Sequence, residues 1–161
     1  MIPNARDLPV DLAYDLKDAI EERAVLCVTG AGTAKAVHAA LADLGHTRPI
    51  EITARRGLTM AGFAHTLYDA LHLEVAHGPA PAEVAATNRR IDAHLARSRP
   101  LLVLKDSEAL RRDVLQDLVH RWKHTPGPCP LILTGTDRLR AALAAAALDT
   151  LVYIWHKLDS A

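Results

Sequence analysis

The sequence is poor in aromatic side chains and has no net charge. It contains two Trp, three Tyr and one Phe in 161 residues, too few for a convincing platform on which nucleic-acid bases could stack. Nineteen Lys and Arg side chains balance nineteen Asp and Glu side chains. The overall charge therefore favours neither a nucleic acid nor a membrane surface as a partner, and only a local basic face could still contact DNA.

Long hydrophobic runs and a disulfide framework are also absent. No stretch reaches the roughly 18 apolar residues that a membrane-spanning helix needs, and the N-terminus lacks the basic-then-apolar layout of a signal peptide. We therefore expect a soluble, cytoplasmic protein with no membrane partner. The two cysteines, Cys27 and Cys129, lie in or beside apolar runs. In a reducing compartment they are expected to be buried, free thiols.

The chain does contain short apolar runs that alternate with longer segments of helical period. The predicted strands are 25–29, 50–53, 101–104, 131–134 and 151–154. The predicted helices cover about 10–22, 34–44, 59–71, 82–96, 106–122 and 138–147. Strands that alternate with helices are typical of βαβ units, so we expect an α/β fold with a parallel sheet and a single domain over residues 1–161.

A glycine-rich segment, residues 29–36, follows the first predicted strand and reads Thr-Gly-Ala-Gly-Thr-Ala-Lys-Ala. A strand, a glycine-rich loop, a lysine and a helix, in this order, are the context of a phosphate-binding loop. The pattern G-x-x-x-x-G-K-[ST] fails at both glycines and at the hydroxyl that holds Mg²⁺, where Thr29, Ala34 and Ala36 stand. If Gly30 is taken as the first glycine, the loop is one residue short. The candidate phosphate-contacting remnant is Gly30, Ala31, Gly32, Thr33, Ala34, Lys35 and Ala36.

Two further phrases strengthen this interpretation. Residues 99–106 read Arg-Pro-Leu-Leu-Val-Leu-Lys-Asp, and residues 131–136 read Leu-Ile-Leu-Thr-Gly-Thr. With the order of elements, they resemble the AAA+ P-loop ATPases of the MuB and TniB transposition-helper kind and related bacterial AAA ATP-binding proteins, over about residues 8–156. The resemblance implies a three-layer sandwich with five parallel strands in the order 5-1-4-3-2. Because the sequence ends at Ala161, we expect no C-terminal lid domain.

The resemblance also points to the positions of the family's other functional residues. Lys105 and Asp106 match the acidic pair that supports magnesium and polarises the attacking water, and Glu108 replaces that acid only if the local register shifts. Thr134 and Thr136 are similar to the polar sensor at the end of the fourth strand. A lysine beside the metal position would repel the cation. We expect Lys105 to pair with Asp106 instead, or to point into solvent.

Relatives often carry an arginine immediately before the fifth strand, and the matching position here is Leu151. Phosphoryl transfer depends on positioned charge and metal, so these losses together predict that ATP is not hydrolysed. We expect a pseudo-ATPase interaction module with no confident catalytic residue, metal or cofactor, which binds a protein partner or its own copies. Two alternatives stay open. One is a genuine ATP- or ADP-binding protein or slow ATPase that uses Lys35, and the other is a DNA-associated helper of the transposition type.

Two other patterns have ordinary interpretations. His120 and His124 are four residues apart on a predicted helix and could face one metal ion, but the cations between them favour a solvated helix end. Several arginine pairs could contact DNA phosphates if they shared one face; the alternative is a set of exposed helix ends balanced by acids such as Asp92 and Asp113. These arginines are Arg55, Arg56, Arg89, Arg90, Arg97, Arg99, Arg111 and Arg112.

Overall fold

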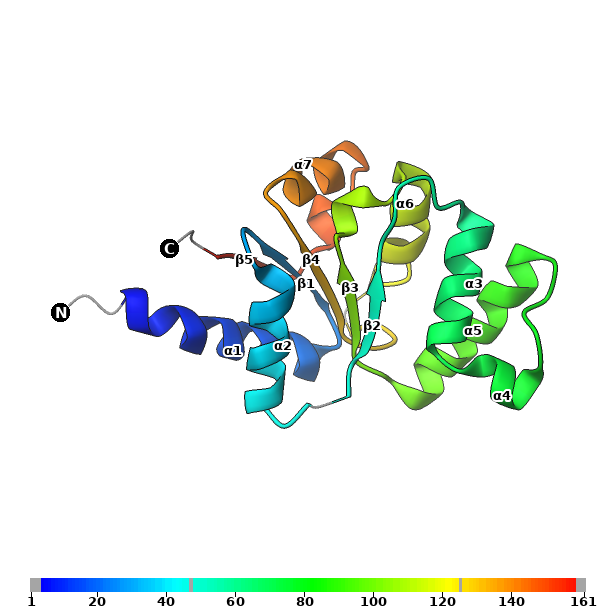
Figure 1. Ribbon diagram of the computed structural model, residues 1–161, viewed down its shortest axis with the longest axis horizontal. Coiled ribbons are helices and arrows are strands. Elements are labelled where there is room, and N and C mark those ends of the chain that lie inside the picture. Colours follow the sequence, from blue (N-terminus) through cyan, green and yellow to red (C-terminus); the bar gives the residue numbers. More distant parts are fainter. Residues whose placement is uncertain (1–3, 47, 125, 159–161) are drawn as a thin grey trace.

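A computed structural model of the protein describes residues 4–46, 48–124 and 126–158, with side chains described from Leu12 onward. Five strands form one parallel sheet in the order β2-β3-β4-β1-β5 (Figure 1). The strands are β1 (Val25–Thr29), β2 (Ile50–Thr53), β3 (Leu102–Lys105), β4 (Leu131–Gly135) and β5 (Ile154–Lys157). This is the predicted order 5-1-4-3-2 read from the opposite edge, so the predicted fold class is confirmed.

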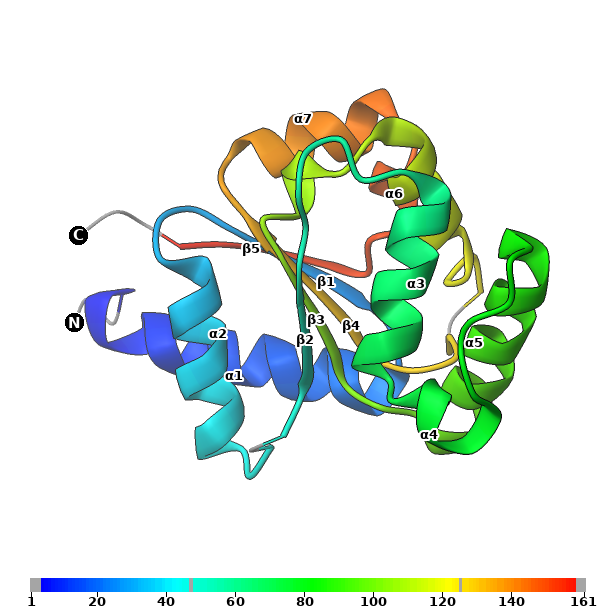
Figure 2. The same ribbon diagram turned by 45° about the vertical axis from the view of Figure 1, so that its right-hand side comes forward.

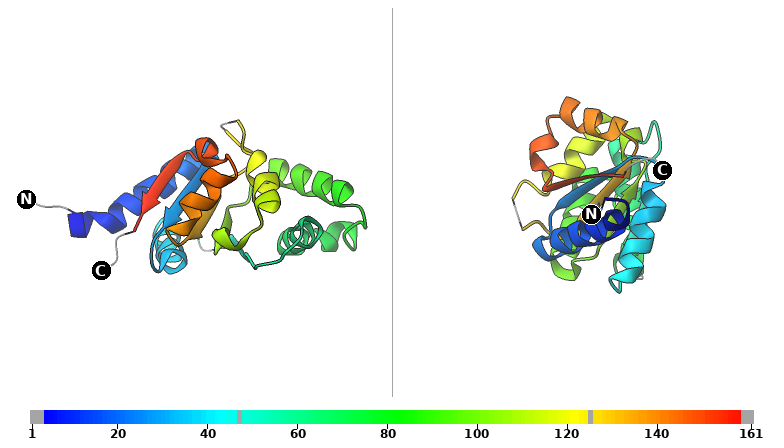
Figure 3. Two further views of the ribbon diagram at one scale, coloured as in Figure 1. Left: turned by 90° about the horizontal axis from the view of Figure 1, so that it is seen from above. Right: turned by 90° about the vertical axis from the view of Figure 1, so that its left-hand side faces the viewer.

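Helices cover both faces of the sheet and complete three layers (Figure 3). One face carries α1 (Asn4–Glu22) and α2 (Thr33–Asp43). The other carries α3 (Met60–Ala70), α4 (Leu73–His77), α5 (Val84–Ser98), α6 (Arg112–His120) and α7 (Arg138–Ala145), with short 3-10 turns η1 (Ser107–Ala109) and η2 (Asp149–Leu151). None of the described helices is long and apolar enough to cross a membrane.

The apolar runs form the central strands for the expected reason. Every residue of β1 and of β4 is buried, because helices cover both sides of these strands and leave no polar face. Thr59 caps α3 as predicted, since its hydroxyl oxygen accepts a hydrogen bond from the Gly62 N–H at 3.0 Å. Both cysteines are buried and free, as predicted.

Four elements differ from the sequence-based expectations. α1 begins at Asn4 rather than near Val10. β5 begins at Ile154 rather than at Leu151, because residues 149–151 form the 3-10 turn η2. The short helix α4 was not predicted. The predicted helix over 106–122 is divided into η1 and α6, and α6 ends at His120. His124 therefore lies beyond the helix, and the two histidines do not share one helical face as a metal pair would require.

Candidate functional site at the carboxyl ends of the strands

The carboxyl ends of the parallel strands lie along one edge of the sheet, at the top of Figures 1 and 2. α2 leaves β1 on one face of the sheet, whereas α7 leaves the neighbouring strand β4 on the other face. In open α/β sheets, ligands bind at the crevice where adjacent connections take opposite faces. The loop after β1 and the chain segments after β2, β3 and β4 are therefore the places where a site is expected.

The loop remnant itself is short. Only the three residues Gly30 to Gly32 connect β1 to α2. Gly30 and Gly32 have positive φ angles of 124° and 66°, which only glycine adopts without strain. The Gly30 N–H donates a hydrogen bond to the Gly135 carbonyl at 3.1 Å, and the Thr33 hydroxyl lies 3.5 Å from the same oxygen. The first amide of the loop is thus already used within the protein.

Backbone from the end of β5 covers this loop. The Leu158 N–H donates to the Thr29 carbonyl at 2.7 Å, and this contact brings the Leu158 carbonyl against Gly30. A Cβ at Gly30 would collide with that carbonyl. Ala36 lacks a hydroxyl and packs against the core between α1 and α2. The loop therefore does not fit a magnesium-bound triphosphate in the way that a working phosphate-binding loop does.

Lys35 keeps its predicted place. It is the third residue of α2, directly after the central strand β1, and its side chain is exposed. The first turn of α2 has no acidic residue and no side-chain cap. Lys35 and the α2 N-terminus are consequently what remains here to attract an anion.

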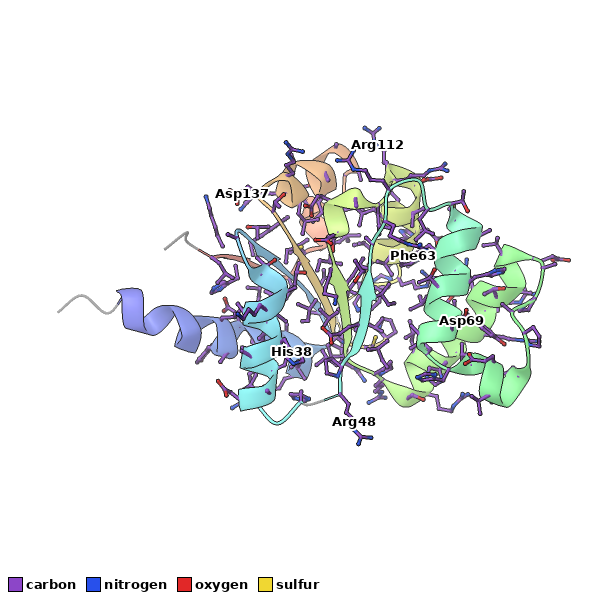
Figure 4. All side chains as sticks on the ribbon, in the orientation of Figure 1. His38, Arg48, Phe63, Asp69, Arg112 and Asp137 are labelled. Carbon is purple, nitrogen blue, oxygen red and sulfur yellow. The ribbon has the colours of Figure 1, made fainter. Side chains whose placement is uncertain are left out.

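Lys105 does not pair with Asp106, so that expectation is wrong. It lies on the same face of β3 as Val103, the face covered by α1 and α2, and its ammonium is 4.0 Å from the Glu51 carboxylate. The other carboxylate oxygen of Glu51 is 3.8 Å from Nδ1 of His38, which Figure 4 shows on α2. The reason lies in the register: Glu51 pairs with Val103, whereas Asp106 turns away in a left-handed conformation.

Glu108, rather than Asp106, reaches the end of β4. One of its carboxylate oxygens accepts hydrogen bonds from the Thr136 N–H at 3.3 Å and from the Thr136 hydroxyl at 3.0 Å. The other oxygen is buried, has no hydrogen-bond partner and lies against Gly135, where a Cβ would collide with it. The signal in the sequence is Gly135, because a glycine in a buried strand often marks the close approach of another group.

The two sensor candidates have different surroundings. Thr134 is buried, and its hydroxyl lies 3.5 Å from the Leu104 carbonyl on the neighbouring strand. Thr136 is exposed and holds Glu108. The position of the relatives' arginine also shifts, because the residue directly before β5 is Tyr153 and not Leu151. Neither position carries an arginine.

A pocket of about 830 Å³ opens beside the loop remnant, over the carboxyl ends of β2, β3 and β4. Three arginines and three acids line it, together with Thr136 and three alanines; the charged residues are Arg55, Arg56, Arg138, Asp106, Glu108 and Asp137. None of the loop residues 30–36 contributes to this lining. Figure 4 shows Asp137 at the same edge of the sheet.

The arginine clusters do not share one face. Arg55 and Arg56 belong to the pocket after β2, whereas Arg89, Arg90 and Arg97 line a groove on α5. Arg111 forms a two-pronged ion pair with Asp113, with hydrogen bonds of 3.1 and 2.8 Å. Asp92 does not balance the arginines of its own helix as expected, because it pairs with Arg121 of the segment after α6.

The two cysteines lie in the middle of β1 and just before β4, away from the carboxyl ends of the strands. Burial raises the pKa of the Cys129 thiol to about 12 and raises that of Cys27 well above its ordinary value, so both thiols stay protonated and unreactive. Within residues 4–46, 48–124 and 126–158, no group of three or more His, Cys, Asp and Glu side chains could hold a metal ion.

Comparison with known proteins supports the fold. No protein-family model and no curated protein matches the chain. Among solved structures, it is similar to a chain in the structure of Drosophila ORC bound to AT-rich DNA and Cdc6, with a TM-score of 0.55 and 18% sequence identity. The match covers 97% of this chain but only 28% of the ORC-complex chain. The likeness shows a shared fold, and the five-stranded parallel sheet in the order 2-3-4-1-5 is consistent with a P-loop NTPase-like fold.

Proposed function

We propose that this AAA+-like domain is a non-hydrolysing module that binds a protein partner. The observation that carries the first half of the proposal is the hydrogen bond from the Gly30 N–H to the Gly135 carbonyl. A working phosphate loop offers its successive amides to the phosphates. Here the leading amide is occupied, and Leu158 backbone lies above the same residue.

The side chains around the loop support the same conclusion. Mg²⁺-dependent phosphoryl transfer needs a hydroxyl after the loop lysine and an acid at the end of the third strand. Ala36 and Lys105 stand at these positions, and Lys105 lies beside Glu51 rather than near an acid of its own loop. Positioned charge supplies most of the catalysis in such reactions. Removing the magnesium-binding hydroxyl and replacing the acid with a lysine is therefore expected to abolish turnover rather than slow it slightly.

The second half of the proposal rests on the pocket over β2, β3 and β4. Its arginines, Arg55, Arg56 and Arg138, are exposed, and none forms an ion pair with another described residue. The Glu108 carboxylate is already held by Thr136. The lining carries three guanidinium groups and three carboxylates. The guanidinium N–H groups are the donors that remain open to the carboxylates of an acidic segment. Arginine binds carboxylates through two parallel hydrogen bonds and is enriched at the energetic centres of protein interfaces.

A displayed library of random peptides, panned on the immobilised protein, tests the pocket. We expect enrichment of acidic peptides whose affinity falls at least tenfold for Arg138→Glu. Arg112→Glu is the matched control, because Arg112 is exposed at the same edge of the molecule but does not line the pocket. Selection of no acidic peptide, or an equal loss in the two variants, would show that this pocket is not the binding site.

A genuine nucleotide-binding protein is the second candidate, because Lys35 is exposed in the first turn of α2. In that case ADP would raise the melting temperature of the wild type but not of Lys35→Ala, since a ligand stabilises only the form that binds it. Kinship with the MuB and TniB type, a bacterial origin and a cytoplasmic location also belong to the proposal. The two free, buried thiols are consistent with a reducing compartment.

A further inference from the structure

Two charged surfaces lie on different parts of the molecule. One is on the second half of α1, which packs against the sheet, and the other is on α5, which forms one end of the molecule together with α4 (Figures 1 and 3). The charges of the whole chain cancel. A basic surface on one part of the chain therefore leaves acidic side chains elsewhere. The basic surface of one copy can then attract the acidic surface of another copy.

The surface on α5 is a basic groove of about 340 Å³, lined by His77, Ala86, Arg89, Arg90, Ala93 and Arg97. No acid lines it, because Asp92 of the same helix points toward Arg121, with Nε of Arg121 2.5 Å from Oδ1 of Asp92. The field at the groove is positive. Desolvation, then Arg97 and His77, lower the pKa of His94 on the same helix.

The surface on α1 and β5 combines carboxylates with exposed tyrosines. Tyr14 and Tyr153 are 73% and 43% exposed, unusually high for large apolar rings in this protein. Tyr14, Lys17, Asp18 and Glu21 share one hollow along α1, and the Tyr153 hydroxyl lies 3.5 Å from Asp18. Partial desolvation, then the carboxylates of Asp18 and Glu22, raise the pKa of Tyr153. The field at this surface is negative.

The two surfaces match in spacing as well as in charge. Tyr14 and Glu21 are seven residues apart on α1, and Arg90 and Arg97 are seven residues apart on α5. Seven residues span two helical turns, about 10.5 Å. An antiparallel pair of helices can therefore place Glu21 against Arg89 and Arg90 while the Tyr14 ring covers the Arg97 guanidinium, as cation–π pairs do.

We propose that the α1 surface of one copy binds the α5 groove of a second copy. Two different surfaces of the same molecule then meet, so the association is head-to-tail and builds open chains rather than closed pairs. The proposal rests on the proposed role as a protein-binding module and names one of its partners. A single helix pair gives an interface at the low end of the size range. The association is therefore weak and depends on salt.

A second copy explains the observations better than nucleic acid does. The groove runs along one helix, the chain has no net charge, and the groove has no Phe, Tyr or Trp among its lining residues on which a base could stack. Nucleic acid is thus the competing occupant that an experiment has to distinguish.

Sedimentation velocity of the wild type and of charge-reversed variants tests the proposal. Arg89→Glu with Arg97→Glu makes the groove acidic, and Asp18→Lys with Glu21→Lys makes the α1 surface basic. We expect the wild type to exceed its monomer mass of 17.4 kDa at concentrations of about 100 µM and low salt, and each double variant to remain monomeric. Arg48→Glu with Arg112→Glu changes the net charge equally at exposed sites elsewhere (Figure 4) and is expected to associate like the wild type.

The quadruple variant that carries both reversals is the decisive sample. Its net charge is again zero and its two surfaces are again complementary, so we expect it to associate. Circular dichroism checks that every variant is folded. A monomeric wild type, or a quadruple variant that stays monomeric although folded, overturns the proposal. So does a wild type that remains monomeric but retards a DNA duplex through Arg89 and Arg97. Peptide binding at the Arg138 pocket is unaffected by these variants, so the two proposals fail separately.

Discussion

The loop after β1 and the pocket over β2, β3 and β4 are neighbours on one edge of the sheet, yet they differ in what they leave open. In the loop, the Gly30 N–H donates a hydrogen bond to the Gly135 carbonyl, and Leu158 backbone occupies the space above Gly30. In the pocket, charged side chains remain exposed around a volume of about 830 Å³. The groups that remain open to a ligand at the carboxyl ends of the strands are therefore mainly the charged side chains of the pocket.

Gly135 links the two regions. Its carbonyl accepts the hydrogen bond from the Gly30 N–H at 3.1 Å, and its missing Cβ leaves room for the buried oxygen of Glu108. Glu108 in turn holds Thr136 at the edge of the pocket. The closed loop and the ordered pocket therefore depend on the same strand end.

The largest expected effect separates the two glycines of the loop. Gly30→Ala places a Cβ against the Leu158 carbonyl at a φ of 124°, so we expect a loss of about 4 kcal/mol in the free energy of unfolding. Gly32→Ala is the matched control. Nothing lies within 4 Å of its Cβ position, so it is expected to lose only the left-handed backbone cost of about 1 kcal/mol. Urea denaturation measures both, and equal losses would mean that Leu158 does not cover the loop.

The second prediction concerns how the stability of the buried sheet depends on pH, through the thiols of Cys27 and Cys129. The thiols of Cys27 and Cys129 have an ordinary pKa of 9.0 in the unfolded chain and a raised pKa in the fold, about 12 for Cys129. Above pH 9 the unfolded chain releases these protons while the folded protein keeps them, so stability falls as the pH rises. Between pH 8 and 10 the loss is about 1.4 kcal/mol for each thiol.

A variant with both cysteines replaced by alanine provides the comparison for this pH dependence. It is expected to lose about 3 kcal/mol less than the wild type over the same pH interval. Urea titrations at pH 8, 9 and 10 give the difference directly. Identical pH dependences in the two proteins would place the thiols in contact with water.

The smallest effect concerns the contact between Glu108 and Thr136. Thr136→Val removes the hydroxyl that lies 3.0 Å from the carboxylate but keeps the shape of the side chain, so we expect a loss of about 1 kcal/mol. Thr136→Ser keeps the hydroxyl and is expected to retain most of the stability. If the serine and valine variants unfold at the same urea concentration, this hydrogen bond contributes nothing to the fold.

Much of the fold could be predicted from the sequence, because it depends on patterns along the chain. Apolar runs between turn residues located β1 and β2 at their observed bounds, and the resemblance to AAA+ proteins supplied the strand order. β5 was placed three residues too early, because residues 151–153 are more apolar than the strand itself. His156 lies within that strand, is buried, and contacts Asp15 at 2.8 Å. A contact between residues so far apart in the sequence cannot be predicted from a local pattern.

The site was harder to predict, since it depends on contacts between distant segments. The missing hydroxyl and glycine of the loop are read directly from the residues, at Ala36 and Ala34. The covering of Gly30 by Leu158 requires the true register of β5, and the approach of Glu108 requires both the left-handed turn at Asp106 and the space at Gly135. Neither the register of β5 nor the approach of Glu108 to Gly135 can be predicted from the spacing of residues along the chain.

ATP turnover by the wild type in the presence of Mg²⁺ tests the central claim most directly. We expect no hydrolysis above background and no enhancement of nucleotide binding by magnesium in a calorimetric titration. The variant Lys105→Asp with Ala34→Gly and Ala36→Thr, measured in parallel, shows how far these three positions alone account for the loss. Hydrolysis by the wild type at a rate typical of AAA+ ATPases, about 1 s⁻¹ or more, would contradict the non-hydrolysing function whatever the triple variant does.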